Sequence, residues 1–277
     1  MAGPIDKVGP WTEVKLEIIQ AYAAAFATIT GAHRFARIYI DGFSGPGVHA
    51  SKETGAEIAG TPLRILKVKP AFAEYHFVDI KPGKVKLLRE RIGSHRGVSI
   101  YEGDSNKVLL ERVLPTMRYE SFRKGLMLLD PYGLTIDWKV IEMAGKSGCV
   151  DLLLNLPIMD MNMNVLMHDR SSVDPSDRSR MNRFWGSEEW EQAAYHEQGG
   201  LFGGSLSIKQ KNEPVVEAFC QRLQDVAGFP FVSTPLMMPN EQGAPLYYLI
   251  GASPKRVGKK VFDDVFEKQR RKRSRSG

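Results

Sequence analysis

The sequence predicts a doubly wound α/β fold, in which helices cover both faces of a mostly parallel sheet. One observation is that short apolar runs alternate with segments of helical period through the first 157 residues. Another is that the runs at 126–129 and 150–156 are almost continuously apolar, which is typical of strands covered on both faces. A third is that an acidic residue and several glycines follow the run at 37–41, and open α/β sheets bind ligands at such strand ends.

Residues 1–30 are predicted to contain a free lead-in followed by an N-terminal helix. Val14, Ile18, Tyr22 and Phe26 recur at the spacing of one helix face. We therefore expect this helix to pack against the sheet before the first strand begins.

Residues 31–157 are predicted to form the core, beginning with a strand that stops at Asp41. Gly42, Gly45 and Gly47 follow, and glycine lets the backbone adopt positive φ and approach a ligand closely. Their spacing is not the dinucleotide pattern G-x-G-x-x-G, and the Gly-Lys-Ser/Thr of a phosphate loop is missing. It does match F-x-G-x-G, read from Phe43.

The remainder of the core alternates strands and helices. Residues 48–60 are rich in glycine and predict either a mobile flap or a surface insertion. Thr61 and Pro62 then supply an N-cap and a first-turn proline for a helix over 63–68. The other expected elements are strands at 74–79, 98–101, 126–129 and 150–156 and helices at 84–92 and 107–114.

Beyond residue 157 the pattern changes. Residues 158–212 predict a small helical insertion over the site, with a flexible mixed-charge linker at 171–180. Residues 213–266 complete the core, with an amphipathic helix at 213–226 and an antiparallel hairpin formed by 231–238 and 246–252. Residues 267–277 form a basic tail.

The stretch Tyr39–Gly47 resembles motif I of S-adenosylmethionine (SAM)-dependent methyltransferases, particularly those that methylate amino groups of nucleic-acid bases. Together with the later run Leu128–Gly133 and the closing strand Tyr247–Ile250, it resembles the three-Cys-motif partner protein family over most of the chain. The resemblance implies a Rossmann-like methyltransferase sheet, SAM as cofactor, RNA or DNA as substrate, and a partner protein with three cysteines.

The resemblance places the cofactor against the turns after the first three strands. Asp79 ends the second strand, where a carboxylate can accept hydrogen bonds from ribose hydroxyls. Asp104 or Ser105 would contact the adenine amino group, or could equally be the N-cap of the next helix. The preceding helix would line the pocket, but Lys15 and Tyr22 fit a solvated lysine and a core tyrosine better. The implied cofactor-binding residues are Asp41, Gly42, Phe43, Gly45, Gly47, Asp79, Asp104 and Ser105.

Asp130, Pro131 and Tyr132 are the predicted catalytic residues. Methylation of an exocyclic amine requires a group that positions the nitrogen and accepts its hydrogen bonds. The resembled enzymes use Asp/Asn-Pro-Pro-Tyr/Phe, in which the ring stacks on the base. Here the second proline is missing, which moves the ring one place closer to the acid and leaves another amine open as the substrate. The alternative interpretation of Asp130–Gly133 is an ordinary strand-exit turn. Asn155 could be a second acceptor near the site or the end of a core strand.

Composition bears on the binding partner, the cellular location and metal binding. The net charge of +6 and pI of about 9.2 permit a polyanionic partner, although six of the positive charges lie at 268–275 and could serve either as a nucleic-acid contact or as a solubilising tail. The sequence has no apolar run long enough to span a membrane and no signal-peptide layout, so we expect a cytoplasmic protein. Two cysteines and six scattered histidines predict no metal site.

The alternative function to a methyltransferase is a non-catalytic SAM- or nucleotide-binding subunit of a radical-SAM-like three-cysteine protein.

Overall fold

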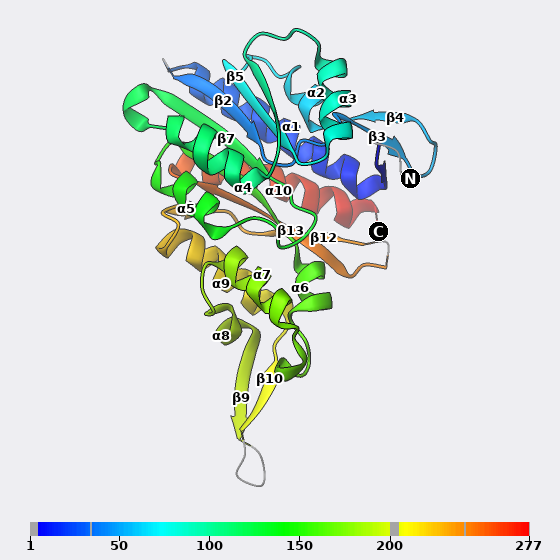
Figure 1. Ribbon diagram of the computed structural model, residues 1–277, viewed down its shortest axis with the longest axis vertical. Helices are drawn as coiled ribbons and strands as arrows, with labels where there is room; N and C mark the ends of the chain where they lie inside the picture. Colours follow the sequence, from blue (N-terminus) through cyan, green and yellow to red (C-terminus); the bar gives the residue numbers. More distant parts are fainter. Residues whose placement is uncertain (1–4, 34, 200–204, 241, 277) are drawn as a thin grey trace.

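A mostly parallel sheet of eight strands forms the centre of the molecule (Figure 1). The computed structural model describes residues 5–33, 35–199, 205–240 and 242–276. Five parallel strands lie in the order β6–β5–β2–β7–β8, and their bounds are Val98–Glu102, Glu74–Asp79, Ala36–Asp41, Arg123–Leu129 and Val150–Leu156. The strands predicted for the core are all confirmed.

The chain enters the parallel sheet at its centre. From β2 it moves outward to β5 and β6, and then crosses back to β7 and β8 on the other side of β2. The carboxyl ends of β2 and β7 therefore flank the topological switch point, where open α/β sheets bind their ligands. This order confirms the doubly wound prediction.

Antiparallel strands close one edge of the sheet, as predicted. Strand β13 (Pro245–Ser253) pairs with β8, and both β12 (Leu236–Pro239) and β11 (Phe231–Val232) pair with β13. The β12–β13 register brings Met238 opposite Tyr247, which places the Tyr247 end of β13 beside the carboxyl end of β8.

Helices cover both faces of the sheet because side chains alternate along each strand. In β2, Ile38 and Ile40 join one hydrophobic cluster, whereas Tyr39 joins the other. The Tyr39 face is covered by α1 (Pro10–Gly31), α2 (Thr61–Ile65), α3 (Pro82–Ile92) and α10 (Arg256–Ser276). The opposite face is covered by α4 (Ser105–Val108) and its continuation to residue 116, by α5 (Trp138–Lys146) and by α9 (Asn212–Asp225).

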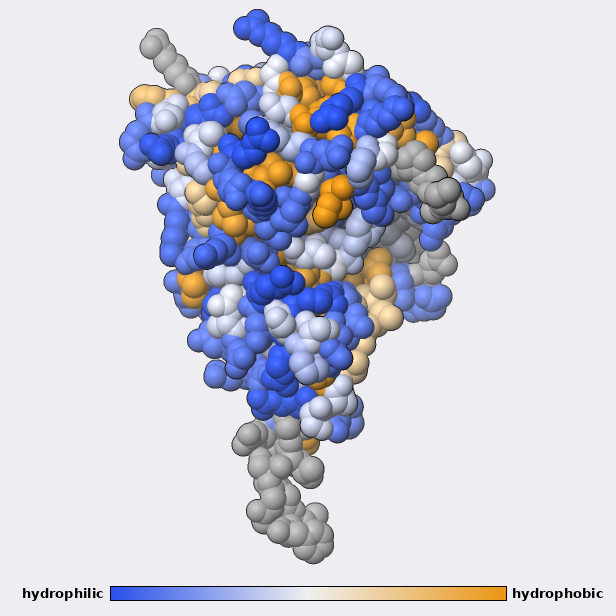
Figure 2. Space-filling model, viewed as in Figure 1, coloured by the Kyte–Doolittle hydropathy of each residue, from blue (hydrophilic) through white to orange (hydrophobic). Residues whose placement is uncertain are grey.

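The insertion at 158–212 projects from the body of the molecule and presents a largely hydrophilic surface on the face seen in Figure 2. It contains α6 (Ile158–Asn164), α7 (Pro175–Trp185), α8 (Trp190–Ala194) and the hairpin of β9 (Tyr195–Gly199) with β10 (Ser205–Lys209), so it is not purely helical. The prediction of a flexible linker at 171–180 is wrong for its second half. The Asp174 side chain caps α7, and Arg178 pairs with the buried Glu191.

The described part of the lead-in, from residue 5, and the loop at 48–60 contain strands that were not predicted. The expected free lead-in contains β1 (Lys7–Val8), which pairs with β3 (Val48–Ser51). The loop at 48–60 is an antiparallel hairpin of β3 with β4 (Glu57–Ala59).

The prediction of a separate basic tail at 267–277 is also corrected, because α10 continues to residue 276. Arg270 and Arg273 hold this end of the helix against the sheet by donating hydrogen bonds to the backbone oxygens of Pro235 and Met237. Within the described residues, no helix combines the length and apolar character needed to cross a membrane.

Candidate functional site

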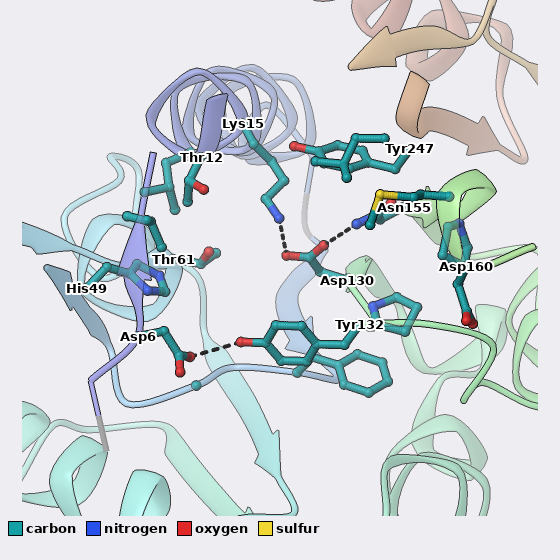
Figure 3. Close-up of a pocket in the computed structure, with 18 of the residues that line it drawn as sticks. Asp6, Thr12, Lys15, His49, Thr61, Asp130, Tyr132, Asn155, Asp160 and Tyr247 are labelled. Carbon is teal, nitrogen blue, oxygen red and sulfur yellow. Dashed lines mark hydrogen bonds and ion pairs between the residues drawn. The ribbon is translucent and has the colours of Figure 1, made fainter. Parts of the chain in front are cut away.

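A cavity of about 470 Å³ opens at the switch point of the sheet (Figure 3). Small-molecule sites usually measure about 300–1,000 Å³, so its size suits a cofactor and part of a second ligand. Its walls come from α1, the β1–β3 segment, the turns after β2, β5, β7 and β8, and the start of β13. Predicted residues in the lining are Phe43, Gly45, Asp79, Asp130, Pro131 and Tyr132.

The turn after β2 is held open toward this cavity by Asp79. The Asp79 carboxylate accepts hydrogen bonds from the backbone N–H groups of Gly45 (3.0 Å) and Lys81 (2.8 Å). Gly45 has φ of +63°, and a Cβ placed there would meet no atom within 4 Å. Open space therefore adjoins this glycine in the cavity, and its contact with a cofactor stays a prediction.

Gly42 and Gly47 serve packing rather than the cavity. A Cβ at Gly42 would lie 2.9 Å from a methyl group of Leu129, and one at Gly47 would lie 2.8 Å from Leu88. Neither glycine is among the cavity-lining residues. They let the turn sit tightly on the sheet.

Asp41 lies beneath the cavity and does not line it. Its Oδ1 accepts the Phe43 N–H at 3.0 Å, while Oδ2 has no hydrogen-bond partner among the described residues. Burial raises the pKa of Asp41 to about 8, and the nearby carboxylates of Asp130 and Asp79 act in the same direction. The ionisation of Asp41 therefore depends on burial and on the carboxylates of Asp130 and Asp79, which line the cavity.

Asp104 and Ser105 lie where β6 leads into α4, and only Ser105 contacts the turn after β2. The Asp104 side chain accepts the Lys107 N–H at 3.0 Å and so caps α4, which is the capping alternative. The buried Ser105 hydroxyl donates to the carbonyl of Gly42. Neither residue lines the cavity, so a direct contact with adenine stays a prediction.

Asp130 occupies the centre of the site at the end of β7, between a cation and an amide (Figure 3). Its Oδ2 accepts a hydrogen bond from Lys15 Nζ at 2.5 Å, and its Oδ1 accepts one from the Asn155 side-chain amide at 2.6 Å. Asn155 is thus both the end of a core strand and a polar group of the site. Each carboxylate oxygen has a second lone pair, so Asp130 can still accept a bond from a bound amine.

Lys15 corrects the favoured interpretation of a solvated lysine and agrees with the pocket-lining alternative. It is not a solvated lysine, because its side chain is only 14% exposed and lines the cavity. Burial alone would lower the pKa of the Lys15 ammonium, but the carboxylate of Asp130 more than offsets this and raises the pKa above its ordinary value. Tyr22 is a core residue, as expected, and its hydroxyl donates to Asp151.

Tyr132 presents its ring to solvent at the mouth of the cavity. The residue is 81% exposed, and its hydroxyl donates to Asp6 at 2.9 Å. Lys84 lies 5.5 Å from the ring centroid and pairs with the same aspartate. An exposed ring held at its hydroxyl end is suited to stacking on a flat ligand.

Part of the cavity wall comes from the insertion, which was expected to stand over the site, and from the start of β13. Met159 and Met163 of α6 line the cavity although they are 40% and 64% exposed, and Leu246 and Tyr247 of β13 complete this side. Met159 and Met163 were not singled out as site residues, although their i, i+4 spacing is that of one helix face.

This arrangement provides a hydrogen-bond acceptor, an exposed aromatic ring and an open glycine turn within one cavity. Among the described residues, no group of three His, Cys, Asp or Glu side chains could hold a metal ion. The chemistry available to the side chains is positioning and hydrogen bonding of an amine beside a second ligand.

No protein-family model and no curated protein matches the sequence, so membership in the three-Cys-motif partner family stays a prediction. The fold itself has a counterpart. A solved protein from Legionella pneumophila, assigned to the family model DUF519, aligns over 90% of both chains with a TM-score of 0.52 and 10% identity. At this identity the likeness concerns the fold alone.

Two further solved structures overlap less well. One, from Listeria monocytogenes, is described as a candidate SAM-dependent methyltransferase; it covers 80% of this chain and 92% of its own, with 10% identity and a TM-score of 0.42. The other, described as a candidate methyltransferase from Thermobifida fusca YX, covers 88% and 83%, with 12% identity and a TM-score of 0.43.

Proposed function

We propose that the protein is a SAM-dependent methyltransferase that transfers a methyl group to an amino group of a nucleic-acid base. SAM would lie against Phe43, Gly45 and Asp79, with the ribose hydroxyls hydrogen-bonded to the Asp79 carboxylate. The target amine would lie against Asp130, with its base stacked on Tyr132.

The observation that carries this proposal is the position of Asp130. Its carboxylate lies in the same cavity as the open Gly45 turn, and Lys15 and Asn155 fix its two oxygens. A fixed acceptor lowers the barrier to transfer, because it aligns the amine with the methyl group and needs no reorganisation.

A nucleic-acid substrate is supported by the charge beside the cavity. The basic end of α10 packs along β12, whose partner strand carries Tyr247 into the cavity. Exposed cations at this position could hold phosphates while a base enters the site. The exposed faces of Tyr132, Met159 and Met163 suit a flat base better than an aliphatic amine.

A non-catalytic binding subunit remains the second candidate, because the same turn could hold SAM without transfer. The missing second proline favours this alternative, since it alters the spacing of the acceptor motif.

Calorimetric titration of SAM tests the cofactor assignment. Gly45→Val would place a side chain in the open cavity and abolish SAM binding. Gly55→Val is the matched control, because Gly55 has a similar φ of +70° and open space but lies on the exposed β3–β4 turn. If the unmodified chain does not bind SAM, the proposal is wrong. If SAM binds but no labelled methyl group reaches RNA or DNA, with or without a three-cysteine partner, the binding-subunit function is favoured.

A further inference from the structure

A second cavity, of about 360 Å³, lies at the opposite end of the parallel strands from the first cavity. It is formed at the amino ends of β7 and β8, between the second half of α1 and the first turns of α10. Its size also falls within the range of small-molecule sites. Its apolar lining includes Tyr22, Phe26, Ile29, Phe35, Tyr119 and Val261. None of these residues takes part in the proposed methyl transfer.

A buried ammonium group distinguishes this cavity from an ordinary packing gap. Lys124 is only 9% exposed, and its Nζ lies 4.8 Å from the ring centroid of Tyr119 and 5.6 Å from that of Phe35. Within the described residues its one hydrogen bond goes to the carbonyl of Gly148, at 3.2 Å. An ammonium has three donors, so two are left for a ligand.

The protein compensates this charge incompletely. Burial lowers the pKa of the Lys124 ammonium, and the nearby Lys255 acts in the same direction, although Cys149 and Asp151 oppose them. A buried cation of this kind is stabilised when an anion hydrogen-bonds to it.

Asp151, the carboxylate of this cavity, is already occupied by neutral donors. One oxygen accepts the Tyr22 hydroxyl at 2.6 Å, and the other accepts the Ser253 hydroxyl at 2.8 Å. No ion pair joins Asp151 to Lys124 in the described part of the chain. The lining therefore offers one buried cation with free donors, flanked by aromatic rings.

We propose that this second cavity binds a small aromatic carboxylate. The ring of the ligand would pack between Phe26, Phe35 and Tyr119, and its carboxylate would accept hydrogen bonds from Lys124. Lys255 also lines the cavity but is exposed, so the buried end of a ligand meets the single cation Lys124, which suits a monoanion. This site is separate from the proposed methyltransferase site and does not depend on it.

The test compares 2-naphthoate with 2-naphthamide, which has the same rings but no charge, by calorimetric titration into the full chain. We expect 2-naphthoate to bind at least about tenfold more tightly, because a charge-assisted hydrogen bond is gained. Lys124→Met keeps the apolar stem and removes the charge, so the two compounds should then bind equally. No binding of 2-naphthoate, or an unchanged preference in Lys124→Met, would overturn the proposal.

A second pair of variants locates the binding site without altering Lys124. Val257 lines this cavity and is 48% exposed, so Val257→Trp should narrow the entrance without disturbing the core and weaken 2-naphthoate at least about tenfold. Met163→Trp is the matched control, because Met163 is similarly exposed but lines the first cavity. Loss of binding in Met163→Trp, with full binding in Val257→Trp, would assign the compound to the first cavity and contradict the inference.

Discussion

Lys15 Nζ lies 2.5 Å from Oδ2 of Asp130 and joins α1 to the carboxyl end of β7 across 115 positions of the sequence. The two side chains are 14% and 24% exposed, so the pair is largely withdrawn from water. The contact fixes the carboxylate at the centre of the cavity and ties the N-terminal helix to the strand that carries the predicted acceptor. It therefore serves both the fold and the site.

We expect Lys15→Met to destabilise the protein by about 3 kcal/mol, because it leaves a largely buried carboxylate without its cation. The double variant Lys15→Met/Asp130→Asn should recover much of this loss, since a neutral amide needs no counter-charge. Urea unfolding of the single and double variants measures the coupling. The exposed Lys7→Met is the control, with an expected change within about 0.5 kcal/mol. Strictly additive effects of the two substitutions would contradict a direct interaction.

Replacing Asp130 and Asp79 one at a time separates methyl transfer from cofactor binding. Asp130→Ala should leave SAM affinity nearly unchanged and slow the methyl-transfer step by roughly 100-fold or more, the effect of losing a positioned polar group. Asp79→Ala should weaken SAM first, because Asp79 also holds the Gly45 turn, and saturating SAM should restore much of its rate. Single-turnover transfer from labelled SAM distinguishes the two variants. Full activity of Asp130→Ala would remove Asp130 from the mechanism.

The strand ends were predictable because strands and their exit turns are encoded locally. The apolar run before Asp41 and the run before Asp130 each predict a strand, and parallel strands bring their carboxyl ends to one edge of the sheet. Both carboxylates accordingly lie at or beneath the same cavity.

Lys15 and the end of α10 were not predictable, because their partners are distant in sequence. A lysine on an amphipathic helix is ordinarily solvated, and nothing near Lys15 indicates a carboxylate 115 residues away. Similarly, the basic run at 268–275 has the composition of a free tail, but Arg273 lies 4.9 Å from the ring centroid of Trp11. Both cases depend on tertiary contacts that override composition.

Asp41 should make stability depend on pH. Its folded-state pKa of about 8 lies above its ordinary value of 3.8, so the folded protein binds an additional proton between these pH values. The stability that protonated Asp41 contributes is therefore fully present below about pH 4 and is lost as the pH rises from there through about 8, with a maximum slope of about 1.4 kcal/mol per pH unit.

Asp41→Asn should remove this dependence, because the amide keeps an acceptor for the Phe43 N–H and carries no charge. Melting temperatures of both proteins across pH 4–8 provide the measurement. Burial raises the pKa of Asp151 to about 6. Asp151 titrates in both proteins, so its contribution to the pH dependence cancels in their difference. Parallel curves for the two proteins would refute the titration of Asp41.

The basic end of α10 should contribute non-specific nucleic-acid affinity. Deleting it would also remove the contacts of Arg270 and Arg273 with the sheet, so we expect substitution of exposed cations to be the cleaner experiment. Lys268→Gln with Arg271→Gln removes two such charges, since Lys268 is exposed and the Arg271 side chain is 73% exposed.

If Lys268 and Arg271 each contact a phosphate, the slope of log K against log salt should become shallower by roughly 1.4 for a single strand or 1.8 for a duplex. Fluorescence anisotropy with a labelled oligonucleotide, measured across salt concentrations, gives this slope. Lys86→Gln with Lys139→Gln is the control, because both residues are exposed on α3 and α5 and the net charge changes equally. An equal change in the control pair would mean that overall charge, and not the end of α10, sets the affinity. An unchanged slope in the α10 pair would show that this end of the helix makes no phosphate contact.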